Sequence, residues 1–252
     1  FKKSNRSIPR RTLSLEEVKR EVQALVQQGH KRILLVSGEG LGMNALDYTI
    51  EAIDAIYGVK MGKGEIRRIN VNIAALPVEG YKRLKAARIG TYQLFQETYH
   101  AGTYKKMHPS GPKSDYIHHL TAMDRAMEAG IDDVGVGILF GLEDYRFEIM
   151  ALLQHIRHLE ERFGTGVHTI SIPRLEPATG SEISVNPPHP VDDRDFRKIV
   201  SILRITVPYT GMILSTREGA EMRREALSLG ISQISAGSRT NPGGYSESDA
   251  AE

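Results

Sequence analysis

Four short segments of the chain bring carboxylate, hydroxyl and guanidinium groups together directly after apolar runs. They are Ser37-Gly38-Glu39, Gln96-Glu97-Thr98, Ser215-Thr216-Arg217 and the segment from Ser235 to Arg239. A carboxylate beside glycines suits an ammonium group, and a guanidinium beside hydroxyls binds a carboxylate or phosphate through charge-assisted hydrogen bonds. On residue types alone, a solvated turn at Glu39 and a structural ion pair between Arg217 and Glu97 are alternatives. Together the segments form a candidate active site.

The apolar runs before these segments predict the elements that position them. Seven runs recur about every 33 residues, the length of one strand-plus-helix unit, and they are Ile33–Glu39, Ile69–Asn72, Tyr92–Thr98, Val134–Gly141, Thr169–Glu176, Gly211–Glu218 and Ile231–Arg239. This spacing predicts an α/β fold, a TIM-type (β/α)8 parallel barrel, whose active site lies at the carboxyl ends of the strands. Seven strands do not close such a barrel, so either the sheet is open or one unit lies outside these residues.

Helices are predicted between the strands. Ser14 and Glu17 form a capping box before an apolar pattern of helical spacing, and similar patterns end at Gly58, Gly130, Gly164 and Pro208. Two long connections, 99–114 and 177–190, each follow a strand and are therefore expected on the active-site face as binding loops.

Composition narrows the class of protein. Lys and Arg number 33 against 31 Asp and Glu, a net charge of +2, which argues against nucleic acid or a membrane as partner. No apolar run reaches the roughly 18 residues of a membrane span, so we expect a soluble, cytoplasmic protein. The absence of cysteine excludes disulfides and thiolate chemistry within these residues.

Other residue patterns give weaker indications. Gly135, Gly137 and Gly141 crowd one strand, which suits a flat ligand or a close backbone and only loosely resembles a dinucleotide site. His100 and His189 fall in the two long connections and are candidates for binding iron or a substrate oxygen. No lysine occupies a strand tail, which disfavours a cofactor-free aldolase or isomerase barrel.

Several motifs in their order resemble the radical S-adenosylmethionine tyrosine lyases, over nearly the whole chain. They are Phe1-Lys2-Lys3-Ser4-Asn5, Ser37-Gly38-Glu39, Gln96-Glu97-Thr98-Tyr99-His100, Gly135–Leu142, Pro173–Pro177, Leu214–Glu218 and Ser235–Tyr245. The resemblance is closer to the hydrogenase-maturation branch of that family than to the thiamine-synthesis branch. It implies a cysteine motif for a 4Fe–4S cluster before Phe1 and an auxiliary iron–sulfur cluster with an extra iron after Glu252. Residues 1–245 would then form an incomplete barrel without its first strand, and 246–252 a disordered tail or a linker to the second cluster region.

The resemblance also implies roles for individual residues. It assigns the S-adenosylmethionine site to Glu39, Glu97, His119, Gly137, Gly141 and Asp144. Glu39 would bind the amino group and Glu97 the polar half of the ligand, and Gly137 through Asp144 would flank the adenine. His119 would stand where the family commonly has an arginine near the methionine carboxylate. The tyrosine carboxylate would be bound by Arg217 and Ser235, with Arg239 as a second possibility. His189 is a candidate ligand of the extra iron.

The activity implied by the resemblance is cleavage of the Cα–Cβ bond of tyrosine to p-cresol and dehydroglycine. In the hydrogenase-maturation branch, dehydroglycine then yields carbon monoxide and cyanide for the FeFe-hydrogenase H-cluster, with maturation proteins and an electron donor as partners. The thiamine branch, which delivers dehydroglycine itself, is the alternative. A cofactor-free aldolase or isomerase barrel is a third reading.

Overall fold

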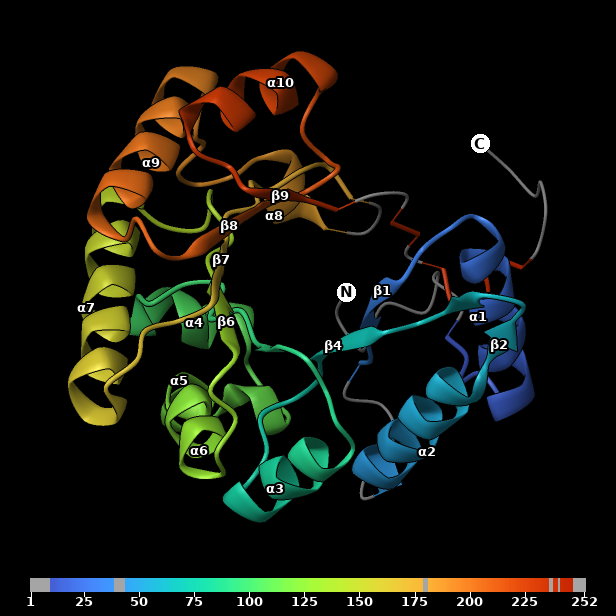
Figure 1. Ribbon diagram of the computed structural model, residues 1–252. Helices are drawn as coiled ribbons and strands as arrows, with labels where there is room; N and C mark the ends of the chain where they lie inside the picture. Colours follow the sequence, from blue (N-terminus) through green and yellow to red (C-terminus); the bar gives the residue numbers. More distant parts are fainter. Residues whose placement is uncertain (1–9, 39–43, 179–180, 236–237, 240, 247–252) are drawn as a thin grey trace.

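A curled parallel sheet forms the centre of the molecule. The computed structural model describes residues 10–38, 44–178, 181–235, 238–239 and 241–246. The sheet contains seven parallel strands in the order β1 (Arg32–Val36), β4 (Arg68–Asn72), β5 (Tyr92–Gln93), β6 (Val134–Gly137), β7 (Thr169–Ser171), β8 (Gly211–Leu214) and β9 (Gln233–Ile234). All seven predicted strands are confirmed, and Figure 1 shows the sheet curving as in a TIM-type barrel. Within the described residues β1 and β9 do not pair, so the barrel is open between them.

Helices cover the outer face of this sheet (Figure 1). The outer helices are α1 (Leu15–Gln27), α2 (Ala45–Gly58), α3 (Val78–Ala86), α5 (Tyr116–Leu120), α6 (Ala122–Glu128), α7 (Tyr145–Phe163), α9 (Asp193–Thr206) and α10 (Ala220–Leu229). The predicted capping box of Ser14 and Glu17 is present at the start of α1, and Gly164 ends α7 with a φ of 72°. The helix predicted up to Gly130 is interrupted at Thr121, which separates α5 from α6.

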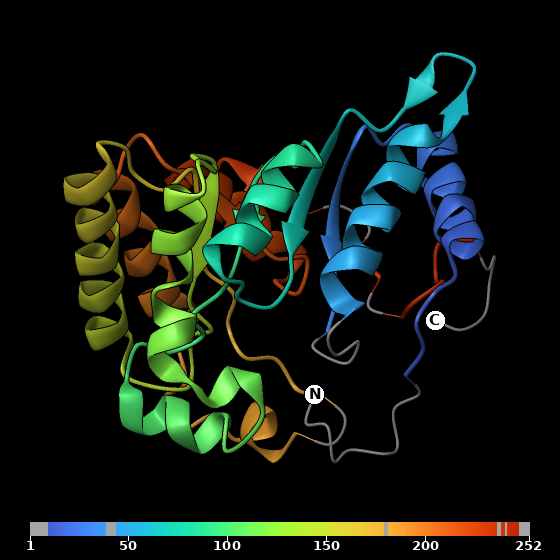
Figure 2. The same cartoon turned by 90° about the horizontal axis from the view of Figure 1, so that it is seen from below.

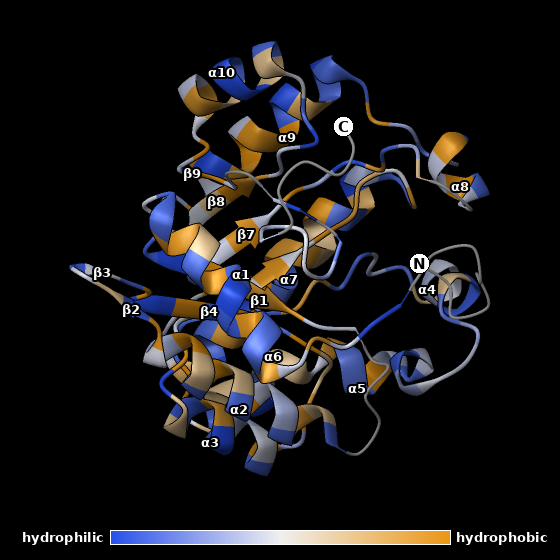
Figure 3. Ribbon diagram, turned by 90° about the vertical axis from the view of Figure 1, so that its right-hand side faces the viewer, coloured by the Kyte–Doolittle hydropathy of each residue, from blue (hydrophilic) through white to orange (hydrophobic). Residues whose placement is uncertain are grey.

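The two predicted binding loops contain short helices. The connection after β5 includes α4 (Ala101–Met107) and a 3-10 turn (Pro112–Ser114), and the connection after β7 includes α8 (Glu182–Val185). Figures 2 and 3 show α4 and α8 at one end of the sheet, and Figure 3 shows the unpredicted hairpin of β2 (Lys60–Met61) and β3 (Gly64–Glu65) at the other. The end with α4 and α8 is the carboxyl end of the strands.

Apolar side chains fill the space between sheet and helices. The strand β6 is buried along its whole length, as expected for a parallel strand covered on both faces. Tyr81 and Tyr92 pack edge to face in the core with their ring centroids 4.8 Å apart, and a hydrogen bond of 3.0 Å joins their hydroxyls. None of the helices in the described ranges is long and apolar enough to cross a membrane.

Candidate active site

Glu97 follows β5 in an uncommon backbone conformation. Its φ is 67°, and the N–H of Thr98 donates to the carbonyl of Gln96 at 2.9 Å, which together define a γ-turn of the positive-φ type. Its carboxylate forms an ion pair with Lys113 and lies 3.3 Å from Nε2 of His108. Burial opposes ionisation, but the hydrogen bond of His108 and the charge and hydrogen bond of Lys113 outweigh it and lower the pKa of Glu97 to about 2. Glu97 is therefore an ionised acceptor, and the alternative pairing with Arg217 is wrong.

Gln96 precedes Glu97 and belongs to the predicted strand-tail segment, although no individual role was predicted for it. Its side chain is buried, and its amide Nε2 has no hydrogen-bond partner within the part of the chain that is described. A buried amide donor without an acceptor is costly, so natural proteins usually pair such a group with a ligand or water. The strand tail at Gln96 thus offers a donor as well as the carboxylate of Glu97.

His119 lies on α5 beneath the same strand tail. It is buried, and its Nε2 donates to the carbonyl of Phe95 at 3.0 Å. Burial lowers the pKa of His119 to about 4, so the ring is neutral near pH 7 and its Nδ1 can only accept hydrogen bonds. Such a ring offers neither charge nor donor to a carboxylate, and the expected contact of His119 gains no support from this geometry.

We expect His119 to make the stability of the fold depend on pH. The pKa of His119 falls from 6.5 in the unfolded chain to about 4 in the fold. As the pH falls from 6.5 to 4, the proton therefore binds to the unfolded chain more readily than to the folded one, and stability is lost over this range. In His119→Gln, whose amide can still donate to Phe95, about 2 kcal/mol of the loss between pH 7 and pH 5 should disappear. Urea unfolding at both pH values measures this, and an unchanged pH dependence would contradict it.

The glycines after β6 have different surroundings. A Cβ on Gly137 would lie 2.7 Å from Phe95, so this glycine is required by packing between neighbouring strands. Gly141 has a φ of 116° and lines a small pocket of about 170 Å³ beneath the loop after β7. Asp144 caps α7 by accepting the N–H of Arg146 at 2.7 Å. Of the three residues expected near the adenine, Gly141 lines this pocket.

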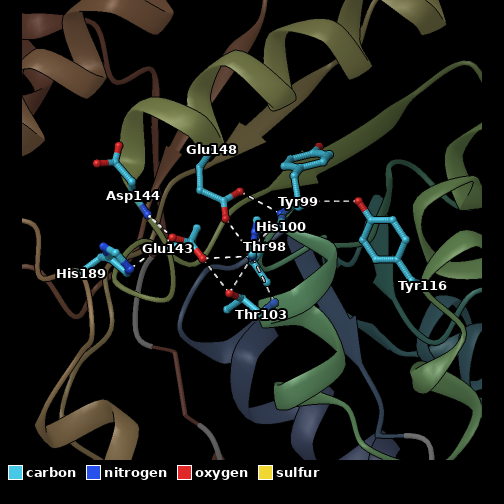
Figure 4. Close-up of polar contacts among 9 residues, drawn as sticks. All are labelled: Thr98, Tyr99, His100, Thr103, Tyr116, Glu143, Asp144, Glu148 and His189. Atoms are coloured by element: carbon cyan, nitrogen blue, oxygen red, sulfur yellow. Dashed lines mark hydrogen bonds and ion pairs between the residues drawn. The ribbon is translucent and has the colours of Figure 1, made fainter.

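Glu143 joins three segments at this end of the barrel (Figure 4). It accepts from the hydroxyl of Thr103 at 2.6 Å and lies 3.1 Å from a ring nitrogen of both His100 and His189. His100 in turn accepts the N–H of Thr103 and so begins α4. Within the described residues no group of three or more side chains could hold a metal ion, so the iron-binding role expected of His189 gains no support.

The tails of β8 and β9 carry the candidate substrate residues. Arg217 is exposed, and its guanidinium makes no hydrogen bond or ion pair with the described residues. Ser235 continues β9, with its N–H bonded to the carbonyl of Leu214 at 3.3 Å. Arg239 is already engaged, because its guanidinium donates to the carbonyl of Gly244 and its N–H to the Tyr245 hydroxyl at 2.9 Å. Arg217 is therefore the better anion anchor. Glu39 lies outside the described residues.

Two buried carboxylates near the strand tails were not predicted as site residues. Glu218, the residue that follows Arg217 in the sequence, accepts two hydrogen bonds from Arg174. Glu148 on α7 binds the tail that follows Glu97, through the hydroxyl of Thr98 and the N–H of Tyr99 (Figure 4). One sequence signal could have revealed Glu148, since it precedes the buried Leu152 and Ile156 at intervals of four and so falls on the apolar stripe of its helix.

Comparisons with known proteins match this arrangement. The crystal structure of HydG, a maturase of the FeFe-hydrogenase, superposes with a TM-score of 0.94 at 56% identity, covering 97% of this chain and 54% of that one. HydG from Carboxydothermus hydrogenoformans gives a TM-score of 0.89 at 50% identity, covering 96% of this chain and 55% of that one. The 2-iminoacetate synthase of Escherichia coli (strain K12) is 32% identical over 248 residues, 98% of this chain and 63% of that protein. The chain thus spans less than two thirds of the length of each relative.

Family models cover both parts of the chain. Residues 171–252 match the Biotin and Thiamin Synthesis associated domain, and residues 1–156 match the Radical SAM superfamily. The second match extends over more than half of the sequence and includes β1 to β6 with the tail at Glu97. Because this family model matches more than half of the sequence, and because the parallel sheet agrees with it, the chain belongs to the Radical SAM superfamily.

Proposed function

We propose that the protein containing this chain is a radical S-adenosylmethionine tyrosine lyase of FeFe-hydrogenase maturation. It would cleave the Cα–Cβ bond of tyrosine to p-cresol and dehydroglycine, and convert dehydroglycine to carbon monoxide and cyanide for the H-cluster. The observation that carries this proposal is the 56% identity to HydG over 97% of the chain. The sequence identity to 2-iminoacetate synthase is lower, at 32%, although that comparison covers a similar share of this chain, 98%.

The second candidate is a tyrosine lyase that releases dehydroglycine for thiamine synthesis. The match of residues 171–252 to the Biotin and Thiamin Synthesis associated domain favours it, as does the relationship to 2-iminoacetate synthase, since 2-iminoacetate is dehydroglycine. Both candidates share the cleavage of tyrosine and differ in the fate of dehydroglycine.

Membership of the superfamily implies S-adenosylmethionine and a 4Fe–4S cluster as cofactors. When bound, they supply a 5′-deoxyadenosyl radical, and the protein orients the reactants and excludes water. The 252 residues contain no cysteine, so they provide no thiolate for this cluster or for the proposed auxiliary cluster with its extra iron. In the proposed role of His189 toward that iron, Nε2 would keep its contact with Glu143 and Nδ1 would bind the metal.

The residues after β5 and β6 fit an S-adenosylmethionine molecule. The amide of Gln96 is a buried donor in need of an acceptor, Glu97 is ionised, and Gly141 opens a small pocket. We propose that Glu97 and Gln96 bind the polar half of the molecule, Gly137, Gly141 and Asp144 flank the adenine, and Glu39 binds the amino group. His119 would support the strand tail through Phe95 and would not contact the carboxylate.

The residues after β8 and β9 fit the carboxylate of an amino acid. The exposed guanidinium of Arg217, unpaired within the described residues, can form two parallel hydrogen bonds with a carboxylate, and the Ser235 hydroxyl can add a third. Arg239 would act by fixing its own loop through Gly244. An electron donor and hydrogenase maturation proteins are the proposed partners, and the cytoplasm is the proposed compartment because reductive radical chemistry needs a low-potential donor.

Product analysis of the full-length protein tests this proposal. The reconstituted protein is incubated without oxygen with tyrosine, S-adenosylmethionine and a reductant, and p-cresol, cyanide and carbon monoxide are measured. All three products are expected. Formation of p-cresol without carbon monoxide would favour the thiamine-pathway activity, and absence of p-cresol would overturn the tyrosine-lyase proposal.

The cofactor site is tested by removing its carboxylates. Glu39→Ala and Glu97→Ala are each expected to weaken S-adenosylmethionine binding at least tenfold, since each deletes a charge-assisted hydrogen bond of about 1.5–3 kcal/mol. Anaerobic calorimetry on the cluster-loaded protein measures the Kd. An unchanged Kd for either variant would remove that residue from the site.

A further inference from the structure

The γ-turn at Glu97 is an unfavourable backbone conformation that neighbouring groups must hold. Turns of this type are rare and strained, and a non-glycine residue at positive φ adds to the cost. Among the described residues only Arg88 and Glu97 combine a side chain with a positive φ. Such strain persists where the surroundings determine the backbone on both sides of the residue.

The sheet determines one side of this turn. The N–H of Gln96 donates to the carbonyl of Gly137 at 3.0 Å, and the N–H of Leu139 donates to the carbonyl of Glu97 at 2.9 Å. Glu97 itself pairs with Ile138 as an isolated parallel bridge. Up to its own carbonyl, Glu97 is thus fixed by β6 and its continuation.

The carboxylate of Glu148 determines the other side. It accepts the N–H of Tyr99 at 2.8 Å and the hydroxyl of Thr98, and that hydroxyl in turn accepts the N–H of His100 at 3.1 Å. Figure 4 shows Glu148 reaching from α7 to these groups. The first polar groups after the turn therefore depend on one buried side chain from another element.

Glu148 has no other structural task among these contacts. Asp144 already caps α7, and Glu148 forms no ion pair with the described residues. Burial raises the pKa of Glu148, so keeping a carboxyl group here is unfavourable unless its hydrogen bonds are needed. An apolar residue would continue the stripe of Leu152 and Ile156 more cheaply.

We propose that Glu148 is a positioning residue that holds Glu97 in its γ-turn and so presents the Glu97 carboxylate to S-adenosylmethionine. This inference rests on the proposed role of Glu97. Without Glu148, the N–H of Tyr99 and the Thr98 hydroxyl lose their acceptor, the turn relaxes, and Glu97 must be restrained again when the ligand binds.

Three variants of the full-length, cluster-loaded protein test the proposal by anaerobic calorimetry. Glu148→Ala should raise the S-adenosylmethionine Kd about 10- to 100-fold, the equilibrium equivalent of releasing one strained residue. Glu148→Gln keeps an acceptor for Tyr99 and should stay within about threefold of wild type. Thr98→Val removes one of the two hydrogen bonds to Glu148 and the acceptor of the His100 N–H at nearly constant shape, and its Kd should fall between those of the other two variants. The tyrosine Kd should not change in any of the three.

Asp124→Asn is the matched control. Asp124 is also a buried carboxylate bound to another element, since it pairs with His158 at 2.7 Å and Arg162 at 2.6 Å, both on α7. Asp124 contacts none of the residues from Gln96 to His100, so loss of its carboxylate should lower the stability of the fold without changing the Kd of either ligand. If Glu148→Ala weakens the binding of both S-adenosylmethionine and tyrosine, as general destabilisation would, the positioning role is overturned.

A double variant separates this inference from the proposed function. If Glu148 acts through Glu97, adding Glu148→Ala to Glu97→Ala should cause no further loss of S-adenosylmethionine affinity. A further loss would overturn the positioning role, as would an unchanged Kd in Glu148→Ala beside a raised Kd in Glu97→Ala. An unchanged Kd in Glu97→Ala itself would reject the proposed cofactor role of Glu97, and the positioning role with it.

Discussion

Replacing Arg217 by alanine is expected to raise the Kd for tyrosine about 30- to 1,000-fold, because removing a guanidinium that is paired with a carboxylate costs roughly 2–4 kcal/mol of binding free energy. The guanidinium is exposed at the carboxyl end of the sheet and has no partner within the described residues, so the free protein would not need to break a contact first. Arg217→Lys should recover only part of the affinity, since an ammonium cannot form the two parallel hydrogen bonds.

Calorimetry with tyrosine and product assays measure this effect. Cleavage of S-adenosylmethionine without turnover of tyrosine should persist in Arg217→Ala, because the cofactor residues lie after β5 and β6. Arg224→Ala removes another exposed arginine, from α10, and serves as the charge-matched control. Equal loss of both activities would show that Arg217 is not a substrate anchor.

The strand positions could be predicted because a parallel sheet covered on both faces imposes apolar runs at a regular spacing. Their lengths could not, and β5 illustrates the reason. In the run Tyr92–Thr98 only two residues are regular strand and Glu97 adds a single bridge to Ile138, and the γ-turn at Glu97 that ends the run has no signal in the sequence. The helix α4 was missed because its first turn is begun by His100, an unusual N-cap residue.

The site could be placed at the correct edge of the sheet from sequence, but the partners of its side chains could not. Glu97 pairs with Lys113 and His108, and Glu148 reaches a tail 49 residues earlier, so both depend on how separate elements pack. Helical spacing indicates that Glu148 is buried, but it does not show which strand tail its carboxylate reaches. His119 shows the converse, since a residue chosen for its place in a motif is neutral and bonded to the backbone.

Arg174→Met is expected to destabilise the fold by about 3–5 kcal/mol, the usual cost of leaving a buried carboxylate without its cation. Glu218 is 3% exposed and Arg174 15%, and both carboxylate oxygens accept from the guanidinium. Methionine keeps an unbranched stem against Phe196, over which the guanidinium lies at 4.6 Å. The variant therefore removes the charge and its hydrogen bonds to Glu218, to the carbonyl of Val191 and to the exposed Asp193. Denaturant unfolding compares the variant with wild type.

An exposed pair of the same geometry is the control. Arg197 also binds a carboxylate, Glu225, with two nitrogens, but their side chains are 42% and 37% exposed, so Arg197→Met should cost less than about 1 kcal/mol. Equal losses in the two variants would contradict the role of burial. The double variant Arg174→Met with Glu218→Leu should regain most of the lost stability, because no buried charge is left unpaired. Since Glu218 directly follows Arg217, tyrosine affinity in that stable double variant would show whether the ion pair also aligns the substrate anchor.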